Sequence, residues 1–290
     1  MLWLLNIAAY LINLVVVNWG VELFGGKSIA ELSTEYRTLV TPAGWAFSIW
    51  GVIFLFELIF VVWAALGENR SSRIVNEGVS YYFIAACLFQ AAWDIAFTHE
   101  YILASTFLIC GIALSLAVVV VRLTPFKRQQ KALFFSVPFW TVHFPIGLHG
   151  GWTLAASLVN INIAIKSDSV SSGTAAVILT VVAASVAAVV AAIHFHDQVY
   201  LLAIAWAVFA IASREDYRIK TLGAPEADGV TRALEVLYIA LLCIGGLSAI
   251  SDVRQRRRNA IQAQNYGSYF ALRGGNVNGN DGLARAMLPA

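Results

Sequence analysis

Thr41-Pro42-Ala43-Gly44-Trp45-Ala46-Phe47-Ser48-Ile49-Trp50 is a Pro/Gly turn that runs directly into an apolar segment ending near Leu66. The segment from Gly44 to Leu66 begins with aromatic residues and has the roughly 17 to 25 residues that a membrane-spanning helix needs. Indole and phenyl rings at one end of such a helix offer stacking surface to a ligand. The stretch therefore predicts a membrane helix with a candidate binding surface in its first turns.

The composition of the whole chain indicates a membrane protein. Of the 290 residues, 59% are hydrophobic and only 12% are charged. Apolar runs of about 20 residues recur, each close to the length that crosses a bilayer. They predict helices at about 2–24, 44–66, 79–98, 101–122, 139–165, 173–195, 198–213 and 230–250. We therefore predict an all-α, polytopic membrane helical bundle with about eight transmembrane helices.

The basic residues predict the orientation of this bundle. If the N-terminus lies on side A, most basic residues at helix ends fall there: Arg70, Arg73, Arg122, Lys127, Arg128, Lys131, Arg254, Arg256, Arg257 and Arg258. Side B receives fewer basic residues, and these are interleaved with acidic residues. The positive-inside rule then places side A, with both termini, in the cytoplasm. The first run has no basic segment before it and is too long for a signal-peptide core, so we expect a retained helix.

Several classes of function lack support in the sequence. The net charge is +2 and the basic residues form no single stripe, which argues against nucleic-acid binding. The three cysteines stand singly, and His143 and His149, six residues apart, fall on opposite sides of a helix. The chain has no Gly-rich phosphate loop, HExxH motif or nucleophile elbow. We predict no catalytic residues, no metal site and no enzymatic activity.

Most candidate ligand-binding residues are expected at one depth on side B, with Trp152 two helical turns deeper. Trp152, Ala156 and Asn160 follow one another at a spacing of four, so a ring, a gap and an amide share one helix face. Trp45, Trp50 and Trp93 are expected at the same end of their helices. A small residue between an indole and an amide leaves room for a flat ligand. The alternative is that these indoles belong to the aromatic belt at the membrane boundary.

Two acidic residues inside predicted spans are informative because a carboxylate there is costly unless it faces a cavity or a partner. Asp94 lies near the side B end of its helix, where it either anchors a ligand or is solvated beside His99 and Glu100. Glu57 lies near the middle of the second span. We expect it to face the bundle interior, either as a structural hydrogen-bonding group or in a proton or substrate path.

Three motifs together resemble the tryptophan-rich sensory protein family, also called TspO or translocator protein (peripheral benzodiazepine receptor). Family members carry Thr-Pro-Pro-x-Trp-x-Phe before a further Trp, an Asn-x-x-Trp-x-x-x-Phe pattern, and a Trp, Ala and Asn at spacings of four. The chain matches them, in order, with 41–47 and Trp50, with Gln90, Trp93 and Phe97, and with Trp152, Ala156 and Asn160. Ala43 replaces the second Pro, Gln90 the Asn and Phe54 a usual Tyr. The sequences Ala43-Gly44 and Phe47-Ser48-Ile49-Trp50-Gly51 resemble a longer, related branch of the family more closely.

The resemblance covers about residues 1–168 and implies a TspO-like five-helix membrane core there. The apolar runs and composition of the remaining chain predict a three-helix membrane extension at 169–252 and a basic, then Gly/Asn-rich tail at 253–290. The segment Gly25 to Val40 would cap a pocket for a porphyrin or other tetrapyrrole, or for a sterol or lipid, with no cofactor required. We read the tail from Ser251 as disordered or bound to a partner. The expected ligand-binding residues are Trp45, Phe47, Trp50, Phe54, Gln90, Trp93, Asp94, Phe97, Trp152, Ala156 and Asn160.

Three functions are compatible with these features of the sequence. The first is a non-enzymatic receptor or carrier that binds or transports a flat hydrophobic ligand. The second is a structural subunit of a larger membrane complex, which the added helices and tail favour. The third, which the absence of an inverted repeat disfavours, is a proton-coupled secondary transporter that uses Glu57 and Asp94. The expected partners are membrane lipids, the ligand, and either a second copy of the chain or a larger complex.

Overall fold

The computed structural model describes residues 1–129, 133–165, 170–214 and 216–272, and in these residues it is helical throughout, without strands. The long helices are α1 (Leu2–Phe24), α3 (Ile49–Ala65), α4 (Tyr82–Thr98), α5 (Ile102–Gln129), α6 (Phe144–Ile165), α7 (Val170–Ile193), α8 (Gln198–Ala212) and α10 (Ala224–Leu272). The short elements are α2 (Ile29–Glu35), η1 (Gly44–Ser48), η2 (Gly67–Ser71), η3 (Ile74–Val79), η4 (Leu133–Phe135), η5 (Phe139–His143) and α9 (Asp216–Leu222).

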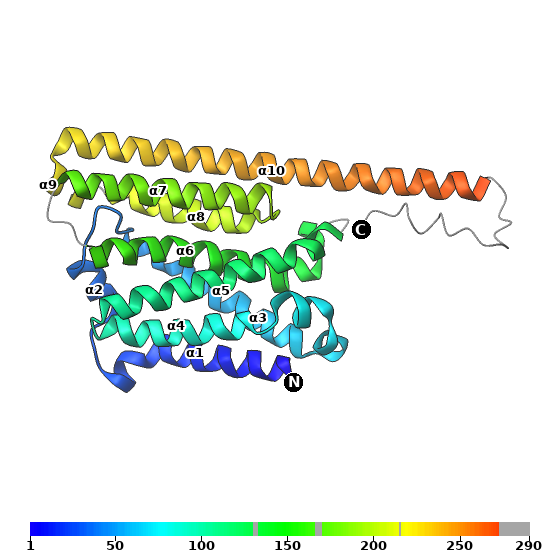
Figure 1. Ribbon diagram of the computed structural model, residues 1–290, viewed down its shortest axis with the longest axis horizontal. Helices are drawn as coiled ribbons and strands as arrows, with labels where there is room; N and C mark the ends of the chain where they lie inside the picture. The colour runs from blue at the N-terminus through cyan, green and yellow to red at the C-terminus, as the bar shows by residue number, and fades with distance from the viewer. Residues whose placement is uncertain (130–132, 166–169, 215, 273–290) are drawn as a thin grey trace.

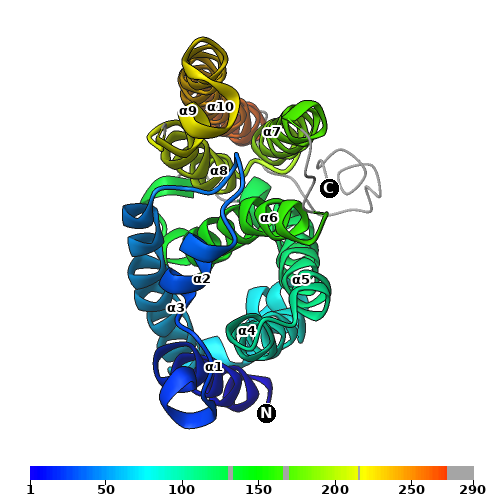
Figure 2. The same ribbon diagram turned by 90° about the vertical axis from the view of Figure 1, so that its left-hand side faces the viewer.

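The helices form a ring with a second group packed on one side. Figure 2, a view along the helices, shows α1, α3, α4, α5 and α6 in a ring with α2 across the near end. In the same view α7, α8 and α10 lie outside this ring, beyond α6. The largest helix contacts around the ring join α1 to α4, α4 to α5 and α5 to α6, and α8 joins α6 to α10. Apolar side chains fill the interior that these contacts enclose.

Glycines on α6 allow the second group to approach closely. A Cβ at Gly151 would lie 2.7 Å from the Ala203 Cβ and would also collide with the Tyr200 carbonyl oxygen of α8. A Cβ at Gly150 would lie 2.9 Å from the Tyr200 ring. Small residues permit this kind of backbone approach between membrane helices. α8 is therefore seated directly against the ring, and Ala207, Ala210 and Ala46 are buried nearby.

The structure confirms a helical membrane bundle but not a count of eight spans. Among the described residues, four helices are long and apolar enough to cross a membrane: Leu2–Phe24, Gly44–Ala65, Ile102–Gln129 and Ala224–Gln262. A fifth span results if the bent pair Gly67–Val79 and Tyr82–Thr98 counts as one. α6 is not among them and buries the polar His149, Thr153 and Asn160 inside the protein. The described parts of α7 and α8 are shorter apolar helices.

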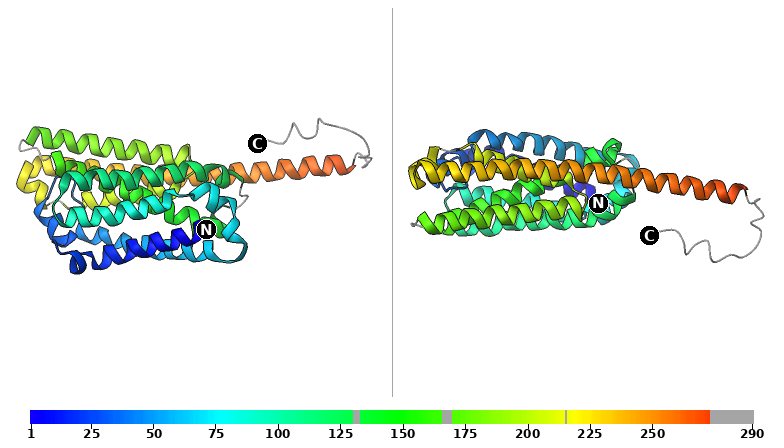
Figure 3. Two further views of the ribbon diagram at one scale, coloured as in Figure 1. Left: turned by 60° about the horizontal axis from the view of Figure 1, so that its bottom comes forward. Right: turned by 90° about the horizontal axis from the view of Figure 1, so that it is seen from above.

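The last helix is longer than the sequence suggested. We expected it to end near residue 250 and a disordered or partner-bound tail to start at Ser251, but α10 continues to Leu272 and projects past the bundle (Figures 1 and 3). The continuation is rich in Arg, Gln and Ala, which favour helix. Asp252 also anchors it by accepting hydrogen bonds from Gln198 and His196, both at 2.8 Å. The tail at 273–290 lies outside the described residues.

Candidate ligand-binding site

A cavity of about 70 Å³ lies between the ring helices, beneath α2. Its lining is predominantly apolar and aromatic, which suits a hydrophobic ligand. α2, α3, α4, α5, α6 and α8 all contribute, together with the segment that joins α2 to η1. The residues are Ile29, Ser33, Tyr36, Thr41, Pro42, Phe47, Trp50, Trp93, Phe97, Ile109, Trp152, Ala155, Ala156, Val159, Asn160, Ile163, Ala207 and Ile211.

Three aromatic side chains form one wall of the cavity. The ring of Trp152 stands nearly perpendicular to those of Phe47, at 5.9 Å, and Trp50, at 6.3 Å between centroids. Such edge-to-face contacts stabilise the arrangement beyond simple burial. The indole nitrogen Nε1 of Trp152 is buried and has no hydrogen-bond partner among the described residues. This wall therefore offers both stacking surface and one free donor.

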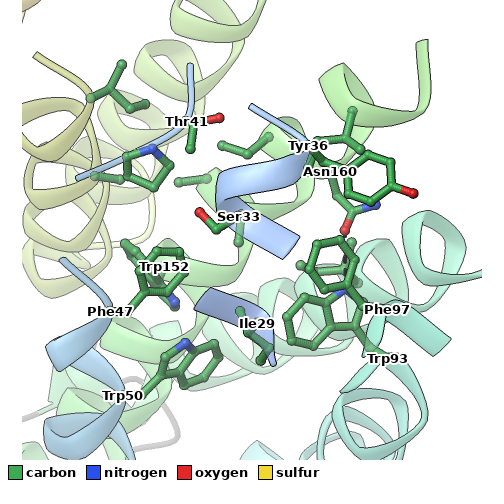
Figure 4. Close-up of a pocket in the computed structure, with 18 residues that line it drawn as sticks. Ile29, Ser33, Tyr36, Thr41, Phe47, Trp50, Trp93, Phe97, Trp152 and Asn160 are labelled. Atoms are coloured by element: carbon green, nitrogen blue, oxygen red, sulfur yellow. Dashed lines mark hydrogen bonds between the residues drawn. The ribbon is translucent and has the colours of Figure 1, made fainter. Parts of the chain in front are cut away.

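A second aromatic pair stands on the opposite side, with α2 between the two groups (Figure 4). Trp93 and Phe97 are stacked with centroids 5.4 Å apart, and the Trp93 indole donates to the Asn160 Oδ1 at 3.3 Å. The Asn160 amide nitrogen donates in turn to Thr106 Oγ1 at 2.7 Å and to Ser105 Oγ at 3.2 Å. These bonds fix the orientation of the amide and the indole at this wall.

Polar contacts hold α2 over the cavity. The helix starts with a capping box in which Ser28 and Glu31 bond each other's backbone N–H groups, and it buries Leu32 completely. Lys27 contacts Glu100 at 2.9 Å, and the Tyr36 hydroxyl donates to Glu100 at 2.7 Å. The hydrogen bonds from Tyr36 and then Lys27 hold the pKa of the Glu100 carboxyl below its usual range. The segment 25–40 thus lies over the cavity and contributes Ile29, Ser33 and Tyr36 to its lining.

The family model for TSPO-like proteins matches residues 3–254 of the chain. The chain belongs to the TSPO-like protein family. No curated protein and no solved structure matches it significantly. The match extends well past residue 168, where the expected five-helix core ends, and so includes α7, α8 and most of α10. The family match thus covers more of the chain than the three motifs do.

Helix α8 belongs to the wall of the cavity in this TSPO-like protein, which the sequence did not suggest. Ala207 and Ile211 line the cavity, and the Trp206 indole donates to the Ala46 carbonyl at 3.1 Å. The Ala43 N–H donates to the Ala210 carbonyl at 3.0 Å. These are ordinary apolar residues in a short apolar helix, and no local motif distinguishes them from packing residues.

The structure brings seven of the eleven expected ligand-binding residues to the cavity: Phe47, Trp50, Trp93, Phe97, Trp152, Ala156 and Asn160. It places the other four elsewhere. Trp45 packs against Trp206 at 4.9 Å, and Phe54 stacks behind Trp50 at 5.7 Å. Gln90 accepts a hydrogen bond from Asn13 at 2.8 Å. Asp94 lies beside Gly20, whose added Cβ would be 2.8 Å from the Asp94 Oδ2.

No group of three or more His, Cys, Asp or Glu in the described part of the chain is arranged to hold a metal ion. The cysteines among these residues, Cys87, Cys110 and Cys243, are free. The chemistry that the cavity offers is therefore stacking, apolar contact and a few hydrogen bonds. These are the kinds of contact that pockets for hydrophobic molecules provide.

Proposed function

We propose that this TSPO-like protein is a non-enzymatic membrane receptor or carrier for a flat hydrophobic ligand, a tetrapyrrole or a sterol. The observation that carries the proposal is the buried, unpartnered indole N–H of Trp152 in an otherwise aromatic wall. A buried donor without a partner is unfavourable, and a ligand acceptor would satisfy it. The stacked rings on two sides of the cavity suit a flat molecule.

Entry of such a ligand requires the cap to move. A cavity of about 70 Å³ holds only a few water molecules, whereas pockets for drug-sized ligands are roughly 300 to 1,000 Å³. The wall on the α2 side is the movable one, because its contacts with the ring through Lys27, Tyr36 and Glu100 are polar and partly exposed. The proposal therefore includes displacement of α2 when the ligand binds.

Tryptophan fluorescence quenching by protoporphyrin tests this function. We expect saturable quenching that weakens about threefold to tenfold in affinity in Trp152→Phe, which keeps a ring but removes the N–H donor. Trp19→Phe is the matched control, because Trp19 is 53% exposed on the outer face of α1. A sterol added as competitor distinguishes the two ligand classes. Absence of saturable quenching and of sterol binding, or equal affinity in both variants, would remove the proposal.

One observation favours the alternative of a structural subunit in a larger complex. α10 has 49 residues, about 74 Å of helix, and projects beyond the ring helices. Its side chains Val236, Ile239, Leu247 and Ile250 are about half or more exposed, which suits either lipid or another protein. The native mass after mild extraction decides between them. A monomer or homodimer supports the receptor, and a particle containing other chains supports the subunit.

A further inference from the structure

A second polar site lies in the interior of the ring, apart from the aromatic cavity. Its centre is a hydrogen bond of 2.6 Å between the His149 Nδ1 of α6 and the Glu57 Oε1 of α3. Both side chains are completely buried. Glu57 is eight residues into α3, about 12 Å along that helix, and is therefore far from the membrane surface. Neither residue lines the aromatic cavity.

The pair has hydrogen-bonding capacity left over. The second carboxylate oxygen of Glu57, Oε2, and the second ring nitrogen of His149, Nε2, have no partner among the described residues. Buried polar atoms in proteins are normally satisfied by protein groups or ordered water. A carboxylate at this depth also needs a compensating positive charge or a proton. The two free atoms therefore point to a small polar ligand.

Amide groups on the neighbouring helices extend this polar interior. Asn6, Tyr10 and Asn13 share one face of α1 and are buried. The Tyr10 hydroxyl donates to the Phe54 carbonyl, three residues before Glu57, so this face of α1 meets α3 at the level of the pair. Both amide atoms of Asn6 and the Oδ1 of Asn13 are buried without a described partner.

Helix α4 supplies a further amide to the same interior. Gln90 accepts from Asn13, while its own Nε2 is buried and has no described partner. The free atoms of Asn6, Asn13 and Gln90 include both donors and acceptors, which is the pattern that buried water satisfies. We take these amides and the Glu57–His149 pair as one buried polar cluster, to which α1, α3, α4 and α6 contribute.

One indole lies between this polar cluster and the aromatic cavity. Trp50 lines the cavity and meets the His149 ring edge-on, with centroids 5.5 Å apart. Two other titratable groups, the Tyr10 phenol of α1 and the Cys87 thiol of α4, are close enough to Glu57 to interact electrostatically with it. α5 contributes the apolar Leu116 beside Gly150.

Other buried titratable groups lie in a different part of the interior. His143, the last residue of η5, interacts electrostatically with Lys127 and Arg256. Lys127 in turn pairs with Asp197 at 2.5 Å. These interactions involve neither Glu57 nor His149.

We propose that Glu57 and His149 form a buried proton-binding site that takes up one proton as a unit, with the neighbouring amides as the route by which water reaches it. With the Nδ1–H of neutral His149 donating to ionised Glu57, the pair carries one negative charge. One added proton makes it neutral, whether the proton resides on the carboxyl or the imidazole. Because the two side chains are joined by a hydrogen bond of 2.6 Å, the proton is bound by the pair and not by either residue alone.

Infrared difference spectroscopy of the purified protein in lipid, recorded as the pH is changed, tests the site. We expect a carboxyl or carboxylate band that titrates in the wild type and is absent in Glu57→Gln, which retains an acceptor for His149. In His149→Asn the Glu57 band should titrate with a midpoint shifted by about one pH unit or more, a tenfold change in proton affinity. Asp94→Asn is the matched control for a buried carboxyl and should leave the Glu57 band unchanged.

Water access provides a second readout that does not depend on the titrating variants. Asn6→Leu keeps the pair but removes two of the free amide atoms, so hydrogen–deuterium exchange at the Glu57 band should slow. A spectrum unchanged in Glu57→Gln, or a midpoint unaffected in His149→Asn, would overturn the proposal. Loss of the band on addition of sodium at constant pH would assign the site to a metal cation and also overturn it. Protoporphyrin binding is measured separately, so failure of either proposal is recognisable.

Discussion

Adding one methyl group at Gly151 should separate α8 from the ring. The new Cβ would lie 2.7 Å from the Ala203 Cβ and would collide with the Tyr200 backbone oxygen, which cannot rotate away. Overpacking of this kind costs about 1 to 3 kcal/mol. The change from Gly to Ala in a helix recovers up to about 1 kcal/mol, and this gain has to be subtracted.

Gly51→Ala provides the matched control for this prediction. Gly51 lies in α3, is exposed, and has no atom within 4 Å of an added Cβ. It receives the helix-propensity gain without the collision, so Gly151→Ala should be less stable than Gly51→Ala by about 1 to 3 kcal/mol. Equilibrium unfolding of both proteins in mixed detergent micelles measures the difference. Equal unfolding midpoints would refute the close approach of α6 and α8 described above.

Two further perturbations have definite expected outcomes. The pKa of Glu100 is lowered in the folded protein, so its contribution to the closed cap is present above the usual Glu value, about pH 4.3, and is lost as the pH falls through the lower folded value. A thiol introduced as Ser33→Cys should therefore be protected from labelling at pH 5 to 8. Adding Glu100→Gln should expose this thiol to labelling at pH 7. Equal labelling with and without Glu100→Gln would contradict the cap contacts. Lys127→Met leaves the buried Asp197 without its partner and should destabilise the protein by about 3 to 5 kcal/mol in chemical unfolding. Adding Asp197→Asn should recover most of that loss, and a double variant as unstable as Lys127→Met argues against a charge effect.

The helices were predictable because their signals are local. Apolar length and Gly/Pro breaks placed α1 at 2–24 and α8 at 198–213, within one residue of the observed ends. Which helices pack against one another was not predictable, because periodicity shows which face of a helix is apolar but not which helix covers that face. The sequence therefore placed α8 in an extension of the core, although α8 lines the cavity beside Trp152.

The residues of the candidate site were likewise only partly predictable from the sequence. Spacing of four put Trp152, Ala156 and Asn160 on one face, and the structure turns that face to the cavity. Depth along the chain also suggested Asp94 as an anchor, but rotation about the helix axis directs it toward Gly20 of α1. The position of a residue along its helix and its angle around the helix axis are independent, and the angle decides which neighbouring helix or cavity the side chain faces.

The sequence by itself determined that this is an all-helical membrane protein of the TSPO-like type, because hydrophobic length and the aromatic motifs are written in consecutive residues. The tertiary structure alone decided the partner of Glu57. His149 is 92 residues away, and a hydrogen bond across that separation depends on how α3 and α6 rotate and pack within the ring. No local pattern encodes that contact, because it exists only once five helices enclose a common interior.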